Sequence, residues 1–83
     1  MIIMERNEVL ERLKPIFRTV FNDESLDVDE TMEAEDFDNW DSVTQMLIVA
    51  SVEKEFNVNF KLREVGELNS VAAFIDGVEK KLQ

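Results

Sequence analysis

The stretch WDSVTQMLIVASVEKEFNVNF, residues 40–60, decides the fold of this 83-residue chain. Apolar residues recur in it at intervals of three and four positions, which predicts an α-helix from about residue 42 to 56. We assign one apolar face of this helix to the core: Ile48, Val49, Val52 and Phe56. A second apolar face lies nearest to Ser42 and comprises Val43, Met46, Leu47 and Ala50. A small domain can hardly enclose a helix on all sides, so we expect this face to be partly exposed and to contact other proteins; the alternative is that both faces are core.

The segments on either side predict further helices. NEVLERLKPIFRTVF, residues 7–21, has the same periodicity and predicts a first helix over about residues 5–21, in which Pro15 introduces a kink or a local break. ELNSVAAFIDGVEKKL, residues 67–82, predicts a final helix that begins after Ser70, a favourable N-cap. NVNF, residues 57–60, is typical of an extended turn, and LREVGEL, residues 62–68, has room for one helical turn. We therefore predict an all-α fold, a small three-to-four-helix bundle that forms a single domain over residues 1–83.

A long acidic loop, residues 22–41, separates the first and second predicted helices. It holds ten of the 19 acidic residues and none of the nine basic ones, so the whole net charge of −10 lies in this segment. We expect these acids to repel one another, with little compensation nearby. Apolar residues are also spaced along the loop, and we expect them to pin it across the fold as an ordered segment. These anchors are Leu26, Val28, Met32, Phe37 and Trp40.

The charge and the missing residue types exclude several classes of function. A net charge of −10 repels nucleic acids and anionic membranes and favours basic protein surfaces as partners. The chain has no cysteine and no histidine, so it lacks a thiolate, a cysteine-ligated zinc site and the usual general base. We therefore expect no enzymatic activity. The apolar start MIIM, residues 1–4, is too short for a signal peptide or a membrane span, which predicts a cytoplasmic protein.

Calcium binding is one alternative use of so acidic a loop. A hand-type calcium loop that starts at Asp27 would need a glycine at its sixth position and a glutamate at its twelfth. The chain has Met32 and Asp38 at these positions, so the fit fails where the turn is tightest. We predict no specific metal site, whereas weak and non-specific binding of divalent cations stays open as an alternative.

Ser42 has two interpretations. Serine is a favoured N-cap, and Gln45 three residues later completes the pattern of a capping box. Asp41 is an equally good cap, however. If Asp41 caps the helix, Ser42 becomes its first residue and its hydroxyl is free in solvent. An anion attached to that oxygen would lie at the positive end of the helix, where it is stabilised.

These residues resemble the acyl carrier protein family. The resemblance rests on the Asp41–Ser42 pair and the helix that follows it in residues 40–60, and on the final helix in residues 67–82. It implies that Ser42 receives 4′-phosphopantetheine from coenzyme A through a separate, magnesium-dependent phosphopantetheinyl transferase. Acyl or aminoacyl groups would then be held as thioesters on the thiol of this arm. The chain would be a monomeric carrier, and the enzymes that load and unload it would be its partners.

The resemblance also implies a role for Asp41, which would correspond to the acid beside the attachment serine and help basic partners to dock. The apolar face inferred above from the helical periodicity would supply the other contacts: Val43, Met46, Leu47 and Ala50. Val43 departs from the leucine that follows the serine in carriers of primary fatty-acid synthesis, and the helix is less acidic than theirs. The chain looks more like a discrete carrier of a secondary pathway. Two alternatives stay open: an unmodified helical adaptor of carrier-like fold, and the weak divalent-cation-binding domain.

Overall fold

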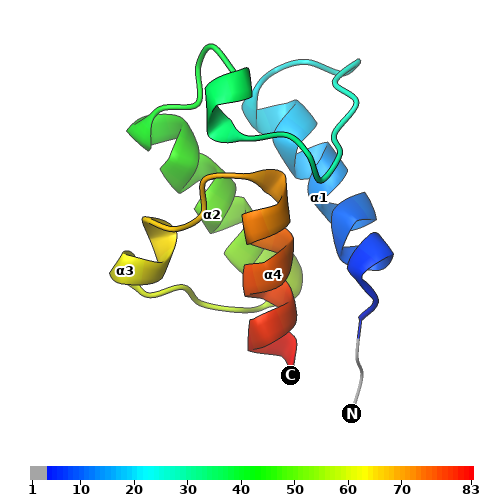
Figure 1. Cartoon of the computed structure of the whole chain (residues 1–83), viewed down its shortest axis with the longest axis vertical. Helices are drawn as coiled ribbons and strands as arrows, with labels where there is room; N and C mark the ends of the chain where they lie inside the picture. Colours follow the sequence, from blue (N-terminus) through cyan, green and yellow to red (C-terminus); the bar gives the residue numbers. More distant parts are fainter. Residues whose placement is uncertain (1–3) are drawn as a thin grey trace.

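Three long helices and one short helix make up most of the structure, a computed structural model that describes residues 4–83. The helices are α1 (Arg6–Val20), α2 (Ser42–Phe56), α3 (Leu62–Val65) and α4 (Val71–Leu82), and a 3₁₀ turn covers Ala34–Asp36. The three long helices pack together, and α3 lies beside them at one edge (Figure 1). Within the described residues no strand forms, and NVNF, for which an extended turn was predicted, begins with a left-handed turn at Asn57 and continues as irregular structure. The predicted all-α bundle is confirmed.

The core lies between α1, α2 and α4. Its fully buried side chains include Phe17 of α1 and Phe74 of α4, whose ring centroids are 5.9 Å apart in an edge-to-face arrangement. The predicted core face of α2 is confirmed, because all four of its side chains are buried: Ile48, Val49, Val52 and Phe56. These contacts leave the other side of α2 unpacked within the bundle.

Local chemistry explains where the helices begin and end. The Ser70 hydroxyl accepts the Ala73 N–H at 3.0 Å, so Ser70 is the N-cap of α4 as predicted. Asn57 ends α2 in the left-handed conformation (φ 55°), which asparagine tolerates better than most residues. Helix α1 continues through Pro15, so the local break considered from the sequence does not occur.

Residues 21–41 connect α1 to α2 and are held at several points. Val28 is buried in the core, and Met32 accepts a backbone hydrogen bond from Val71 at 3.0 Å. Near its end the segment contributes aromatic rings: Trp40 lies 5.6 Å from Phe17, centroid to centroid. The acidic loop of residues 22–41, called the acidic segment from here on, is therefore anchored to the beginning of α4 and to the side of α1.

The acidic segment has one compensating base among the described residues, in keeping with the expectation of little compensation nearby. Arg6 of α1 contacts Glu30 at 2.7 Å, and the same guanidinium contacts Asp76 and Glu79 of α4 at 2.6 and 2.8 Å. Asp76 and Glu30 raise the pKa of Arg6 further above its usual value, so its charge is fixed. One cation thus joins α1, the acidic segment and α4, although the partners are up to 73 residues apart in sequence.

The apolar start MIIM lies mostly outside the described residues, which begin at Met4. From Met4 onward, none of the helices combines the length and the apolar character that crossing a membrane requires.

Candidate functional site

The candidate site is the first turn of α2, where Asp41 is the N-cap. Its Oδ1 accepts the backbone N–H of Thr44 at 2.9 Å, and the Thr44 hydroxyl donates in turn to the Asn39 carbonyl at 2.7 Å. The helix therefore begins at Ser42, as the interpretation with Asp41 as the cap predicts. The alternative in which Ser42 itself is the cap is wrong.

Asp41 carries a negative charge beside Ser42. The hydrogen bond from the Thr44 backbone N–H, followed by a contribution from the Thr44 side chain, lowers the pKa of Asp41 below its usual value. Each of these bonds favours the ionised carboxylate. The residue before the serine is therefore an anion at neutral pH, in an exposed position that a binding protein can reach.

The side chain of Ser42 is free. It is exposed, and its hydroxyl makes no hydrogen bond to any of the residues that the structure describes. Ser42 borders a shallow groove of about 380 Å³ between the start of α2 and the α3–α4 connection. Trp40 and Met46 line the groove on one side, and Val65 and Gly66 line it on the other.

Gln45 joins the two sides of this groove. Its Oε1 accepts the Trp40 indole N–H at 2.7 Å, and its Nε2 donates to the carbonyls of Val65 and Leu68 at 3.0 and 2.8 Å. Gln45 fits a capping-box pattern in the sequence, and nothing in that pattern indicates this role. This position requires a side chain that accepts one hydrogen bond and donates two, and an amide can do so. The partners lie up to 23 residues away in sequence, so the local pattern around Gln45 does not indicate them.

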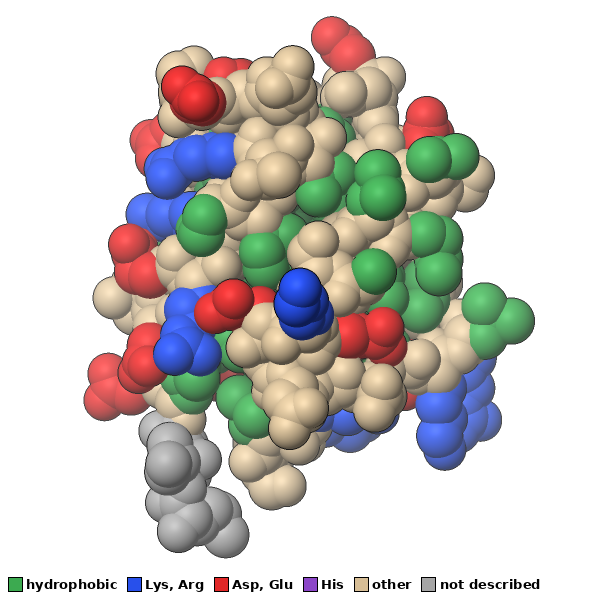
Figure 2. Space-filling view, turned by 180° about the vertical axis from the view of Figure 1, so that it is seen from behind, with side chains coloured by type: hydrophobic (Ala, Val, Ile, Leu, Met, Phe, Trp, Pro, Cys, Tyr) green, Lys and Arg blue, Asp and Glu red, His purple; other side chains and the backbone are tan. Residues whose placement is uncertain are grey.

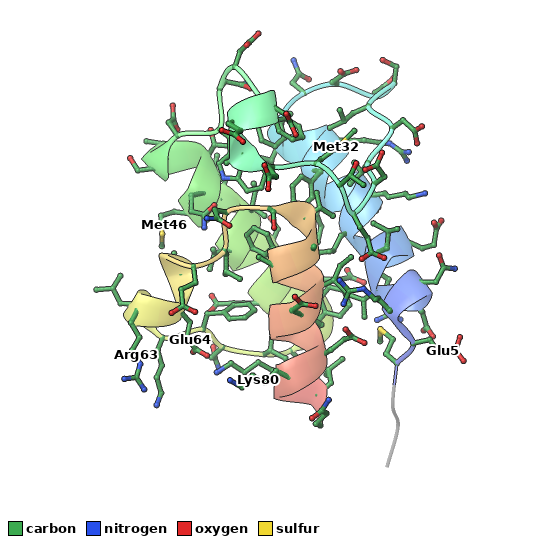
Figure 3. All side chains as sticks on the ribbon, viewed as in Figure 1. Glu5, Met32, Met46, Arg63, Glu64 and Lys80 are labelled. Carbon is green, nitrogen blue, oxygen red and sulfur yellow. The ribbon has the colours of Figure 1, made fainter. Side chains whose placement is uncertain are left out.

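The second apolar face of α2 is exposed, as the sequence analysis expected. The exposed fractions of Val43, Met46 and Leu47 are 69, 51 and 53%, and Ala50 is exposed as well. Figure 3 shows Met46 projecting from α2 on the side where α3 lies. Leu62 of α3 is 83% exposed and adds to this surface. The exposure of Leu62 could not be predicted from periodicity, because it is a lone leucine in a four-residue helix.

The acidic residues do not build a metal site. Glu35 raises the pKa of Glu33 through a hydrogen bond between the two side chains and through charge repulsion. Among residues 4–83, however, no three acidic side chains are placed to hold a metal ion together. The structure therefore gives the divalent-cation alternative no built site.

One comparison with known proteins finds a related structure. The chain is similar to the solution structure of a holo acyl carrier protein from Geobacter metallireducens, with 39% sequence identity. The match covers 89% of this chain and 85% of that one, with a TM-score of 0.80. No family model matches the chain, and neither does any curated protein.

Proposed function

This chain belongs to the acyl carrier protein family, and we propose that it holds acyl or aminoacyl intermediates on a 4′-phosphopantetheine arm attached to Ser42. Family membership rests on 39% identity over 89% of the chain with a holo carrier. Members of this family are carriers and not enzymes, so partner proteins perform the chemistry. The whole chain would act as one carrier domain.

The observation that carries the proposal is the division of roles between Asp41 and Ser42. Asp41 satisfies the Thr44 N–H at 2.9 Å, so the helix does not need the serine oxygen as a cap. Ser42 can then offer its hydroxyl as a nucleophile without loss of the helix start. A phosphate on that oxygen would lie at the N-terminus of α2, where the helix dipole favours an anion.

The surroundings of Ser42 fit such an arm. The residue is exposed beside an open groove, so a long substituent meets no steric barrier. When bound, the group supplies a terminal thiol for thioester formation, which this cysteine-free chain cannot supply itself. Asp41, Val43, Met46, Leu47 and Ala50 surround the attachment point or extend from it along α2. We propose that they contact the transferase and the loading and transfer enzymes.

The character of α2 supports a carrier of a secondary pathway. The segment from Ser42 to Val52 contains no charged residue, and Val43 directly follows the serine. A partner would meet apolar side chains along the first eleven residues of this helix, with Asp38 and Asp41 before its start and Glu53 and Glu55 near its end. We propose a discrete carrier of polyketide, peptide, aminoacyl-transfer or polysaccharide-modifying chemistry in preference to one of primary fatty-acid synthesis.

The test is intact mass after incubation with coenzyme A, magnesium and a broad-specificity phosphopantetheinyl transferase. The wild type should gain one phosphopantetheine, and Ser42→Ala should gain none. Ser25→Ala is the matched control, because Ser25 is also exposed and lies in the acidic segment, and it should be modified like the wild type. Modification of Ser42→Ala would refute the attachment site. A wild type that several transferases leave unmodified would favour the adaptor alternative.

A further inference from the structure

The exposed side of α2 changes its electrostatic character from one end to the other. Asp38 and Asp41 lie before the helix, and the next eleven residues, Ser42–Val52, carry no charge. We call the exposed apolar face of α2 (Val43, Met46, Leu47 and Ala50) the exposed stripe. Lys54 lies four residues after Ala50, so it continues this stripe by one helical turn. The stripe therefore begins beside carboxylates and ends beside an ammonium group.

Helix α3 extends the basic end of this surface. Lys61 and Arg63 flank the protruding Leu62, and all three are exposed. Gln45 ties the end of α3 to the first turn of α2, which places Val65 and Met46 on the same groove. Figure 2 shows the result at the edge where α3 lies: acidic side chains above, hydrophobic side chains in the middle, and Lys and Arg side chains below.

The bases at this edge form no direct ion pair, although the Lys61 backbone N–H, then Lys81 and the charge of Lys61 lower the pKa of the nearby Glu64. Lys54, Lys61 and Arg63 have no carboxylate within 4.0 Å among the described residues. Of the six other bases, four form ion pairs (Arg6, Arg12, Lys14 and Lys81), whereas Arg18 and Lys80 form none with the described residues. In a chain with a net charge of −10, a group of unpaired cations beside exposed apolar side chains is a local exception.

Two of the nearest acids along the chain, Glu64 and Glu53, already accept hydrogen bonds within the protein. Glu64 contacts Lys81 at 2.9 Å and accepts the Lys61 backbone N–H at 2.7 Å. Glu53 accepts the Phe60 N–H at 2.8 Å. Glu67 lines a second groove, which lies between α3 and α4. The exposed side of α3 thus presents Leu62 between two cations.

We propose that this edge docks a protein surface whose apolar side chains are bordered by carboxylates where they meet α3. The inference rests on the proposed function and names the chemistry of its partner. Apolar contact with Met46, Leu47 and Leu62 supplies the buried area. Carboxylates opposite Lys61 and Arg63 fix the orientation, because the reverse orientation would bring acids against Asp41. A partner that is basic throughout would be repelled at this edge.

Two synthetic amphipathic helical peptides test the proposal. They share one leucine face, which is bordered by glutamates in the first peptide and by lysines in the second. Binding is followed by amide chemical shifts of the labelled protein at about 0.15 M salt, which screens distant charges. The glutamate peptide should shift the amides of α3 and of the exposed stripe of α2. The lysine peptide should instead shift residues 22–41.

A matched pair of charge reversals sharpens the test. Arg63→Glu should weaken binding of the glutamate peptide by roughly three- to tenfold. Lys80→Glu makes the same charge change on α4, at an exposed base without an ion pair to the described residues, and should change binding less than about twofold. Figure 3 shows Arg63 at the outer edge of α3, apart from Lys80 on α4.

Three results would overturn the inference. The first is a glutamate peptide that leaves the amides of α3 unshifted, and the second is an equal effect of Arg63→Glu and Lys80→Glu, which would reflect net charge alone. The third is concentration-dependent self-association that Arg63→Glu abolishes, because it would assign the edge to a second copy of the chain. Transferase labelling of the same samples keeps the two proposals separate. An unmodified wild type refutes the carrier function, whereas a modified wild type without peptide discrimination refutes only this docking surface.

Discussion

The Trp40 indole N–H donates a 2.7 Å hydrogen bond to the side-chain oxygen of Gln45. This bond fixes which end of the Gln45 amide faces the α3–α4 connection, where the nitrogen donates to two backbone carbonyls. Trp40 itself packs against Phe17 and Phe74 of the core, with ring centroids 5.6 and 6.2 Å away. The turn that bears Ser42 is therefore linked rigidly to the core on one side and to α3 on the other.

The cap at Asp41 predicts a separation of stability from modification. Asp41→Ala should lower the melting temperature at neutral pH, because the Thr44 N–H loses its acceptor. Ser42→Ala should change the free energy of unfolding by less than about 0.5 kcal/mol, since its hydroxyl is exposed and unbonded. The measurement compares the thermal unfolding of both variants with that of the wild type. A large loss with Ser42→Ala would show that the serine, and not Asp41, stabilises the helix start.

The pKa of Asp41 gives this prediction a pH dependence. Its pKa is lower in the folded state, so its contribution to stability is present above the unfolded-state pKa and is lost as the pH falls through the folded-state pKa. The difference in melting temperature between the wild type and Asp41→Ala should therefore be largest at neutral pH. It should shrink in a pH series that descends to about pH 3. A difference that stays constant over the series would contradict an ionised cap.

Leu47 and Ile48 are neighbours in sequence on opposite sides of α2, and they should respond differently to substitution. Leu47 is 53% exposed, so Leu47→Glu should leave the helical circular dichroism intact and slow transferase modification, by roughly three- to tenfold in kcat/KM. Ile48 is fully buried, so Ile48→Ala should cost about 2–5 kcal/mol of unfolding free energy. If Leu47→Glu unfolds the chain, Leu47 belongs to the core and the interface assignment is wrong.

The bounds of the long helices could be predicted from the sequence because their signals are local. Ser70 and Asp41 are caps that act within three residues, and the apolar periodicity of α2 separates buried Ile48 from exposed Leu47. Burial of the second face of α2 could not be decided from periodicity. That question depends on where α1 and α4 lie, and both pack on the Ile48 side.

The features that sequence reasoning missed depend on contacts between distant residues. Arg6 binds Glu30, Asp76 and Glu79, and nothing in the pattern around Arg6 specifies these partners. Gln45 fits a capping-box pattern locally, yet its amide is used by the α3–α4 connection. Such side chains have several possible partners, and only the packed structure selects among them.

The Glu33–Glu35 contact predicts that one acid in the segment is destabilising. The pKa of Glu33 is raised, so the protonated form favours folding and this contribution is lost as the pH rises through the folded-state pKa. Glu35→Gln should therefore raise the melting temperature at neutral pH and lower the pKa of Glu33 in a titration followed by NMR. Glu24→Gln is the matched control in the same segment, since Glu24 is exposed and forms no ion pair with the described residues. An equal gain from both variants would indicate a general charge effect and no specific pair.

The acidic segment as a whole should respond to screening. Of its ten acids, Glu30 alone forms an ion pair with a base among the described residues. Added salt or millimolar magnesium should weaken the remaining repulsion and raise the melting temperature at neutral pH. Sodium chloride and magnesium chloride at equal ionic strength separate screening from binding. No change, or a decrease, would mean that the repulsion is already compensated.

Gln45 offers an isosteric test of the link between α2 and the α3–α4 connection. In Gln45→Glu the carboxylate can still accept the Trp40 indole N–H, but it cannot donate to Val65 and Leu68, whose carbonyls lie 3.0 and 2.8 Å from Nε2. Two carbonyls lose their donor and face an anion, so the variant should lose roughly 1–3 kcal/mol of unfolding free energy at neutral pH.

The pH dependence of this loss distinguishes the lost bonds from a general effect of charge. The facing carbonyls and the half-buried position disfavour the charged form and raise the pKa of the introduced carboxyl. Protonation restores one donor, so the stability relative to the wild type should recover in part as the pH falls through that pKa. Asn59→Asp, an amide-to-acid change at an exposed site, controls for the added charge. Fluorescence of Trp40, the single tryptophan, reports the groove directly. If Gln45→Glu is as stable as Asn59→Asp at neutral pH, the Gln45 amide does not hold the two segments together.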